Sequence, residues 1–196
     1  MILSNLDIHS ALDSGALVIE PEPTPRLPTE DGEDCPYQTS AVDLCLGDEI
    51  SWIREKLAIS INLRDGGLPK LLGENSENRK LNLDEPYTLE PGKFVLARTH
   101  ERIELPIRED PPWLAARVEG RSSYARCGLL VHFTAPTIHC GYSGTITLEI
   151  MNFGAYPISL YPRTPICQLI VEELKSQPFR NDSQFHGQTK PSGPAA

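Results

Sequence analysis

One short segment near the middle of the chain constrains the fold more than any other. From residue 145 to residue 150, polar and apolar side chains alternate without exception. This period of two is typical of a β-strand with one buried face, so Ile146, Leu148 and Ile150 point to the core and Glu149 points away. The 18 Pro and 14 Gly, spread along 196 residues, also favour short strands and turns over long helices.

Local signals outline the other elements. Ser4 predicts the start of a helix over residues 5–14 and Gly15 predicts its end. A short helix is predicted to end at Cys127-Gly128. Strands are predicted over residues 16–21, 40–53, 94–99, 102–105, 113–118, 158–161 and 166–174, and turns over residues 46–48, 89–92, 100–101 and 151–154. The proline-rich residues 21–37 and the polar residues 64–80 are expected to be loops.

The segment before the alternating strand carries candidate ligands for an anionic molecule. In GRSSYAR, the side chains of Arg121, Ser122, Ser123 and Arg126 can donate hydrogen bonds, and the carboxylate of Glu149 can transfer protons. Taken separately, these features have structural explanations. A serine before a short helix is commonly a cap, and a polar strand face is commonly the hydrated side of a sheet.

Composition excludes several classes of protein. A net charge of −9 argues against binding of a nucleic-acid polymer, which requires a basic surface. Five cysteines without a CxxC motif suggest neither a disulfide framework nor a zinc knuckle, and free thiols fit the reducing cytoplasm. The chain has neither a signal-peptide pattern nor an apolar run of membrane-spanning length.

The order of the motifs resembles the dCTP deaminase family, relatives of the trimeric dUTPases. GRSSYARCGL, TAPTI, GYSG and TLE follow one another, and the flanking segments from MILSNLDIHSALDSGALVIEP to SQFHGQTKPSGP resemble the rest of the family. The resemblance implies a mainly β fold, a dUTPase-like distorted β-barrel of jelly-roll type with a few short helices. It also implies a β domain over residues 1–174, an arm over residues 175–196 that closes over the nucleotide, and a homotrimer.

The same resemblance implies an activity, which is metal-free hydrolytic deamination of dCTP to dUTP and ammonia, supplying dUTP for the synthesis of dUMP and dTTP. Zinc is not expected, because the H-x-E…P-C-x-x-C signature of zinc deaminases is absent, and Mg²⁺ would arrive on the triphosphate. Glu149 is the implied acid/base, while Ser122, Arg126 and the backbone of Ala135 hold the water and the developing charge. The implied nucleotide contacts are Arg121, Ser122, Ser123, Tyr124, Ala125, Arg126, His139, Thr147, Leu148, Glu149, Phe179, Gln184 and Gln188. dTTP and dUTP are candidate inhibitors.

Three positions depart from the family pattern. Ile138-His139-Cys140-Gly141 stands where the family has Ile-Asp-Pro-Gly, Thr137 replaces an arginine, and Gln184 replaces a lysine. In the related dUTPases the aspartate orients the water that attacks the phosphate chain, so His139 predicts that dUTP accumulates. Two alternatives stay open: a bifunctional dCTP deaminase/dUTP pyrophosphatase and a non-catalytic nucleotide-binding homologue. The intact GRSSYAR and TLE motifs disfavour a purely structural β domain.

Overall fold

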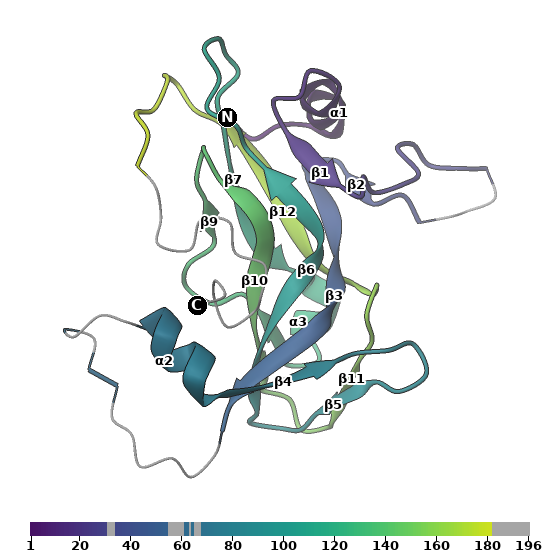
Figure 1. The fold of residues 1–196 in the computed structure, drawn as a ribbon. Coiled ribbons are helices and arrows are strands. Elements are labelled where there is room, and N and C mark those ends of the chain that lie inside the picture. Colours follow the sequence, from purple (N-terminus) through teal and green to yellow (C-terminus); the bar gives the residue numbers. More distant parts are fainter. Residues whose placement is uncertain (31–33, 55–60, 63, 65–67, 182–196) are drawn as a thin grey trace.

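A curled sheet forms most of the molecule in the computed structural model, which describes residues 1–30, 34–54, 61, 62, 64 and 68–181 (Figure 1). Its strand order is β8-β10-β6-β3-β12-β7-β9, with β1 attached to β6 and with β2 and β4 attached to β3. These strands are β1 (Val18–Glu20), β2 (Tyr37–Gln38), β3 (Ala41–Ile53), β4 (Ser76–Lys80), β6 (Phe94–Glu104), β7 (Leu114–Gly120), β8 (Leu129–Val131), β9 (Thr137–Ile138), β10 (Ser143–Asn152) and β12 (Pro165–Glu173).

Smaller elements surround this sheet. β5 (Tyr87–Leu89) and β11 (Ile158–Leu160) form a separate two-stranded sheet at one end of the molecule (Figure 1). The helices of the described residues are α1 (Asn5–Asp13), α2 (Leu68–Asn75) and α3 (Ser122–Ala125). None of them is long and apolar enough to cross a membrane.

The sheet is curled, so that strands far apart in its order approach each other. Gly120 at the end of β7 lies against β8, where a Cβ on this glycine would lie 3.3 Å from the carbonyl oxygen of Val131. Closing a sheet on itself in this way encloses one face as a core. The predicted mainly β, distorted-barrel fold is therefore confirmed.

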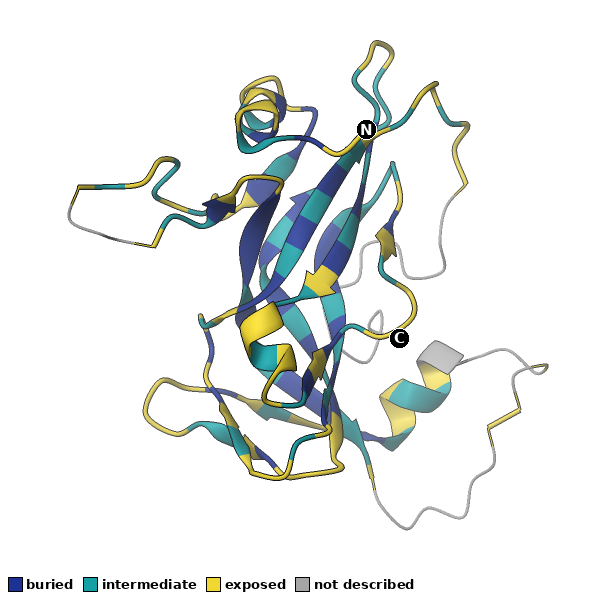
Figure 2. Ribbon diagram, turned by 180° about the vertical axis from the view of Figure 1, so that it is seen from behind, coloured by how far each residue is buried: buried dark blue, intermediate teal, exposed yellow. Residues whose placement is uncertain are grey.

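The enclosed face holds the apolar side chains that the sequence pattern assigned to it. Ile146 is 2% exposed, and Leu148 and Ile150 are fully buried. Figure 2 shows the same alternation of buried and more exposed positions along the long strands. Full burial of a side chain of this size contributes about 1.5–3 kcal/mol. Since one face is buried, the register of β10 is fixed and Glu149 must face the other side.

The predicted first helix is confirmed. Ser4 caps α1 through a capping box, in which its hydroxyl accepts the backbone N–H of Asp7 and the Asp7 carboxylate accepts the backbone N–H of Ser4. Gly15 follows the helix with a φ of 68°, the left-handed conformation that glycine adopts readily. The helix packs its buried Ile8 onto the sheet core.

The turn predicted over residues 46–48 is wrong, because β3 runs unbroken through it. The pairing register between β3 and β6 shifts between Leu46 and Ile50, so the extra residues are absorbed inside the strand as an irregularity. A Cβ on Gly47 would lie 2.9 Å from the carbonyl oxygen of Arg98. The glycine therefore permits a close approach of two strands rather than a turn.

The turn predicted at His100–Glu101 is also wrong, because β6 continues through it. The Thr99 hydroxyl donates to the carbonyl oxygen of Glu101 at 2.7 Å and accepts the backbone N–H of Ile146 at 3.0 Å. Glu101 is only 4% exposed, and its carboxylate accepts the backbone N–H of Cys45 at 2.9 Å. Polar side chains that suggested a turn in the sequence thus satisfy backbone groups inside the sheet.

The loop predicted over residues 64–80 is wrong for most of its length, since α2 and β4 occupy it. β4 pairs with the far end of β3, from Lys80 opposite Glu49 to Ser76 opposite Ile53. Strands at sheet edges are commonly polar, so the composition of this segment resembled a loop. The turn predicted over residues 151–154 also begins later, because β10 extends to Asn152.

Candidate active site

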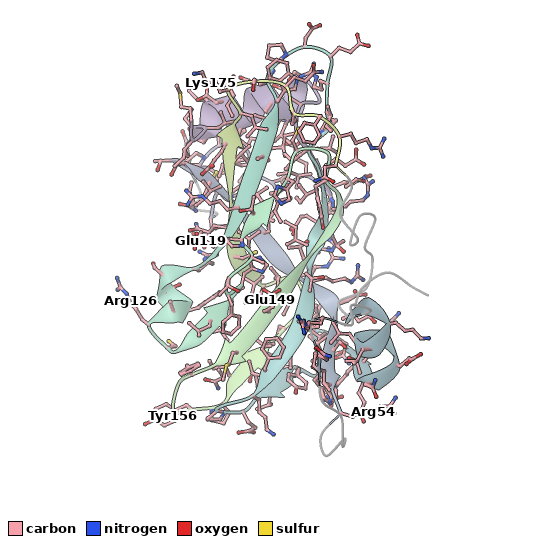
Figure 3. All side chains as sticks on the ribbon, turned by 90° about the vertical axis from the view of Figure 1, so that its left-hand side faces the viewer. Arg54, Glu119, Arg126, Glu149, Tyr156 and Lys175 are labelled. Carbon is pink, nitrogen blue, oxygen red and sulfur yellow. The ribbon has the colours of Figure 1, made fainter. Side chains whose placement is uncertain are left out.

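Glu149 lies near the C-terminal end of β10, between β6 and β8. It is opposite Leu96 of β6, and the next residue, Ile150, is paired with Val131 of β8. Its side chain is 29% exposed, so the carboxylate is partly shielded but open to a ligand. Figure 3 shows Glu149 in the middle of the molecule on this strand.

His132 contacts Glu149 through both its side chain and its backbone. Its Nδ1 lies 2.8 Å from Glu149 Oε2, and its backbone N–H donates to the carbonyl oxygen of Glu149, also at 2.8 Å. The side-chain atoms are close enough for a hydrogen bond but poorly aligned for one, and the contact is an ion pair when the ring is protonated. The β8–β10 pairing explains the contact, because it ends at Val131 and places the next residue beside Glu149.

His132 also connects Glu149 to Ala135. The Nε2 atom lies 2.8 Å from the carbonyl oxygen of Ala135, and a carbonyl oxygen only accepts hydrogen bonds. Nε2 is therefore the donor in this contact, and the carboxylate beside Nδ1 favours a second proton on the ring. The backbone of His132 has a φ of 62°, which is uncommon for a residue other than glycine and turns the chain sharply after β8.

The pKa values of the two groups move in opposite directions. Burial alone would raise the pKa of Glu149, but contact with His132 and the backbone N–H of Phe133 outweigh burial and hold that pKa below its ordinary 4.5. Burial alone would lower the pKa of His132, but Glu149, the Ala135 carbonyl and the charge of Glu119 raise it above 6.5. Glu149 is therefore ionised in the resting protein and can accept a proton.

The GRSSYAR segment forms α3 and lies apart from Glu149 within the chain. Ser122, Ser123, Ala125 and Arg126 are exposed, and Figure 3 shows Arg126 projecting outward from the molecule. Among the residues that the structure describes, no hydrogen bond or ion pair joins α3 to Glu149. The structure thus brings together Glu149 and Ala135, but it does not bring Ser122 or Arg126 to them.

Arg121, just before α3, has partners of its own. Its Nη1 lies 3.3 Å from Oδ2 of Asp43, and its guanidinium carbon lies 5.8 Å from the centre of the Tyr124 ring. The Tyr124 ring therefore packs against the Arg121 guanidinium. Asp43 belongs to β3 and was not among the site residues expected from the sequence.

His139 lines a cavity of about 570 Å³. The walls come from the end of β6, the segment from β9 to the start of β10, and the chain after β12, and they include Glu104, Ile107, Thr137, His139, Tyr142 and Arg180. This volume is within the range that holds a small-molecule ligand. Two of the positions that depart from the family pattern thus face the same cavity.

The remaining predicted contacts have different outcomes. Thr147 shares the outward face of Glu149, whereas the side chain of Leu148 is fully buried in the core, so only its backbone can meet a ligand. Phe179 is 86% exposed. Gln184 and Gln188 lie outside the described residues, as does most of the arm, so the division at residue 174 stays a prediction.

The described part of the chain holds no group of three or more His, Cys, Asp or Glu side chains placed to bind a metal ion. The predicted absence of zinc and the arrival of Mg²⁺ on the nucleotide remain predictions. All five cysteines are free thiols.

Sequence reasoning missed two residues of this region, His132 and Asp43. His132 could be linked to Glu149 only once the pairing of β8 with β10 was known. Asp43 carries a clearer signal, since it is an acidic residue in an otherwise apolar run, AVDLCL, and such a residue is rarely buried without partners.

Comparison with known proteins agrees with the fold and with the family that the sequence resembles. A family model described as dCTP deaminase-like matches residues 2–174. A protein of Methanothermobacter thermautotrophicus named "dCTP deaminase, dUMP-forming" is 39% identical over 196 residues, covering 97% of this chain and 91% of that protein. A "dCTP deaminase" of Natronomonas pharaonis is also 39% identical, covering 97% and 92%. The crystal structure of 2'-deoxycytidine 5'-triphosphate deaminase from Agrobacterium tumefaciens shares the fold, with a TM-score of 0.58 and 20% identity, covering 87% of this chain and 47% of that chain.

Proposed function

Because the chain belongs to the dCTP deaminase-like family, we propose that it is an enzyme that converts dCTP and water into dUTP and ammonia. The observation that carries this proposal is the arrangement of Glu149, His132 and Ala135, in which an ionised carboxylate and a backbone carbonyl lie on either side of one imidazole ring. A partly exposed carboxylate that is ionised in the resting protein can accept a proton from water.

In this mechanism Glu149 performs the proton transfers. It takes a proton from the water that attacks C4 of the cytosine ring and passes that proton to the ring nitrogen. It then takes the proton of the new hydroxyl on C4 and delivers it to the amino group, which departs as ammonia while the C4 carbonyl forms. The resemblance implies that the backbone of Ala135 also helps to hold this water. His132 keeps Glu149 ionised between turnovers and orients its carboxylate.

The other two expected participants would come from a neighbouring copy of the chain. Ser122 and Arg126 are exposed on α3, and Arg126 points away from Glu149 (Figure 3), so a second protomer can receive them. This supports a homotrimer with closed symmetry, in which each copy supplies α3 to the site of another. Arg126 would stabilise the charge that develops on the ring and hold a phosphate.

Mixing of two inactive variants tests the shared site. Glu149→Gln and Arg126→Met should each abolish ammonia release alone, because each removes a different half of every site. After dissociation and reassembly together, mixed oligomers contain some sites with both native residues, so part of the activity should return. Absence of recovery, together with a monomer in light scattering at all concentrations, would exclude the shared site.

The product distinguishes the proposed deaminase from the bifunctional dCTP deaminase/dUTP pyrophosphatase. The name of the Methanothermobacter relative describes a dUMP-forming enzyme, whereas that of the Natronomonas relative specifies no further product. We propose dUTP as the product here, because His139 stands where the family carries a carboxylate. The dUTP would feed dUMP and dTTP synthesis in the cytoplasm, with dTTP or dUTP as inhibitors.

Incubation with dCTP and Mg²⁺, followed by separation of dUTP, dUMP, ammonia and pyrophosphate, tests the proposal. Accumulation of dUTP with an equal amount of ammonia supports the deaminase. Formation of dUMP and pyrophosphate favours the bifunctional alternative. Nucleotide binding without ammonia release would identify a non-catalytic homologue.

A further inference from the structure

Asp43 is a buried carboxylate whose position is fixed from several strands. Its side chain is 7% exposed, Oδ1 accepts a hydrogen bond from Gln168 Nε2 at 2.9 Å, and Oδ2 accepts one from Gln38 Nε2 at 3.3 Å. Its own backbone N–H donates to the carbonyl oxygen of Pro36 at 2.8 Å. Gln168 lies directly opposite Asp43 in the pairing of β12 with β3, so the donor is held by the sheet itself.

The side-chain amides of Gln168 and Gln38 donate hydrogen bonds to Asp43 but carry no charge. A buried carboxylate needs a cation close by, since leaving its charge uncompensated is costly. Arg121 provides that cation at 3.3 Å. Arg121 in turn depends on Asp43, because a carboxylate that cannot rotate holds the guanidinium in one place.

Tyr124 supports the same guanidinium from another side. The guanidinium carbon lies 5.8 Å from the centre of the tyrosine ring, within the range of a cation–π contact. The Arg121 side chain remains 29% exposed, so part of the guanidinium is open to a ligand. A guanidinium has five N–H donors, so donors remain for an anion after Nη1 has met Asp43.

We propose that Asp43 is a positioning residue for the phosphates of the nucleotide, acting through Arg121. It fixes the guanidinium in one orientation before the ligand arrives, so the conformational entropy of this long side chain is not lost again on binding. The inference rests on the proposed function, because it takes a nucleoside triphosphate as the ligand. If the ion pair were purely structural, its loss would destabilise β3. It would then weaken the binding of ligands with and without phosphates equally.

Asp43→Asn tests this directly, because asparagine keeps the size and removes the charge. We expect the Kd and KM for dCTP to rise roughly three- to tenfold, the change expected when one side chain is no longer preorganised. Binding of deoxycytidine, which has no phosphate, should stay within about twofold, and kcat should change less than KM. Glu172→Gln is the matched control, because it removes a similar carboxylate–arginine pair, with Arg117 at 2.8 Å, from the same sheet.

A double-mutant cycle separates positioning from general damage to the sheet. In an Arg121→Met background, Asp43→Asn should no longer weaken dCTP binding, because its effect passes through Arg121. An equal loss in both backgrounds, or an equal loss for dCTP and deoxycytidine, overturns the inference. If Asp43→Asn does not fold, Gln38→Ala should produce a smaller loss that is again specific for dCTP, and a loss without that specificity overturns the inference equally.

The binding measurements also keep this inference separate from the proposed activity. Phosphate-dependent weakening in a protein that releases no ammonia would retain the positioning role and reject the deaminase. Ammonia release with no phosphate-dependent weakening would retain the deaminase and reject the role of Asp43. A wild-type protein that binds dCTP no more tightly than deoxycytidine would also reject the positioning role.

Discussion

The Glu149 carboxylate and the His132 imidazole face each other at 2.8 Å, and the backbone N–H of His132 also donates to the carbonyl oxygen of Glu149. This double connection ties the proposed base to the turn that follows β8. The histidine extends it to the carbonyl oxygen of Ala135 at 2.8 Å. Three chain positions that the proposed reaction needs are therefore held at fixed spacing before any ligand binds.

Glu149→Gln should abolish ammonia release while leaving dCTP binding nearly intact. Glutamine keeps the size of the side chain and its hydrogen bonds but cannot transfer protons. Loss of one acid–base step alone lowers the rate by about 10²–10⁴-fold, and the proposed mechanism assigns more than one step to Glu149. A variant that keeps more than about a tenth of the activity, a loss below ~1.4 kcal/mol, would show that another group is the base. Glu172→Gln, which removes a carboxylate paired with Arg117 on β12 and β7, is the control and should keep most of the activity.

His132→Asn should move the acid limb of the kcat/KM profile to higher pH. Contact with His132 lowers the pKa of Glu149 against the opposing effect of burial, so activity that needs the carboxylate is present above this lowered pKa. Without the imidazole ring of His132, the effect of burial on Glu149 is no longer offset, so the pKa of Glu149 rises. Asparagine suits the test because it does not titrate and tolerates the left-handed backbone of this position, where φ is 62°. Profiles from pH 4 to pH 9 that superimpose for the two proteins would contradict the role of the pair.

Gly154→Ala should destabilise the protein and weaken catalysis together. A Cβ on Gly154 would lie 2.3 Å from the carbonyl oxygen of Cys127, and one on Gly128 would lie 2.4 Å from the backbone nitrogen of Gly154. The chain crosses itself here, just after the strand of Glu149 and just after Arg126, so an added methyl group forces the two apart. Overpacking of this kind costs ~1–3 kcal/mol, measurable by chemical denaturation.

Gly73→Ala provides the control for that experiment. Nothing lies within 4 Å of a Cβ built on Gly73, which sits in α2. Replacing an exposed helical glycine by alanine stabilises a helix by about 0.5–1 kcal/mol. Opposite signs for the two substitutions are therefore expected, and a stability loss at Gly73 equal to that at Gly154 would show that the crossing has no special role.

The parts of this protein that sequence could predict are those governed by local pattern. Strict alternation located β10 and oriented Glu149, and the residues around Ser4 located α1, because both signals depend on neighbours in the chain. The wrong turn predictions at Gly47 and Glu101 share a cause. Glycine and charged residues suggest turns unless a partner strand or a backbone donor is known. His132 was missed for the same reason, since its contact with Glu149 follows from the pairing of β8 with β10.

The cavity beside His139 provides the last prediction, which concerns the product. A carboxylate at this position would carry a fixed negative charge and could orient water toward the phosphate chain, whereas an imidazole is not a fixed negative charge. The wild-type protein should therefore accumulate dUTP. His139→Asp should leave ammonia release similar or higher, because the proposed deamination uses Glu149 and Ala135 and not this position, and should introduce some dUMP. His139→Asn, which has nearly the same shape as aspartate without its charge, is the matched control and should form none. Conversion of dUTP into dUMP and pyrophosphate by the wild-type protein would instead assign the chain to the bifunctional enzymes.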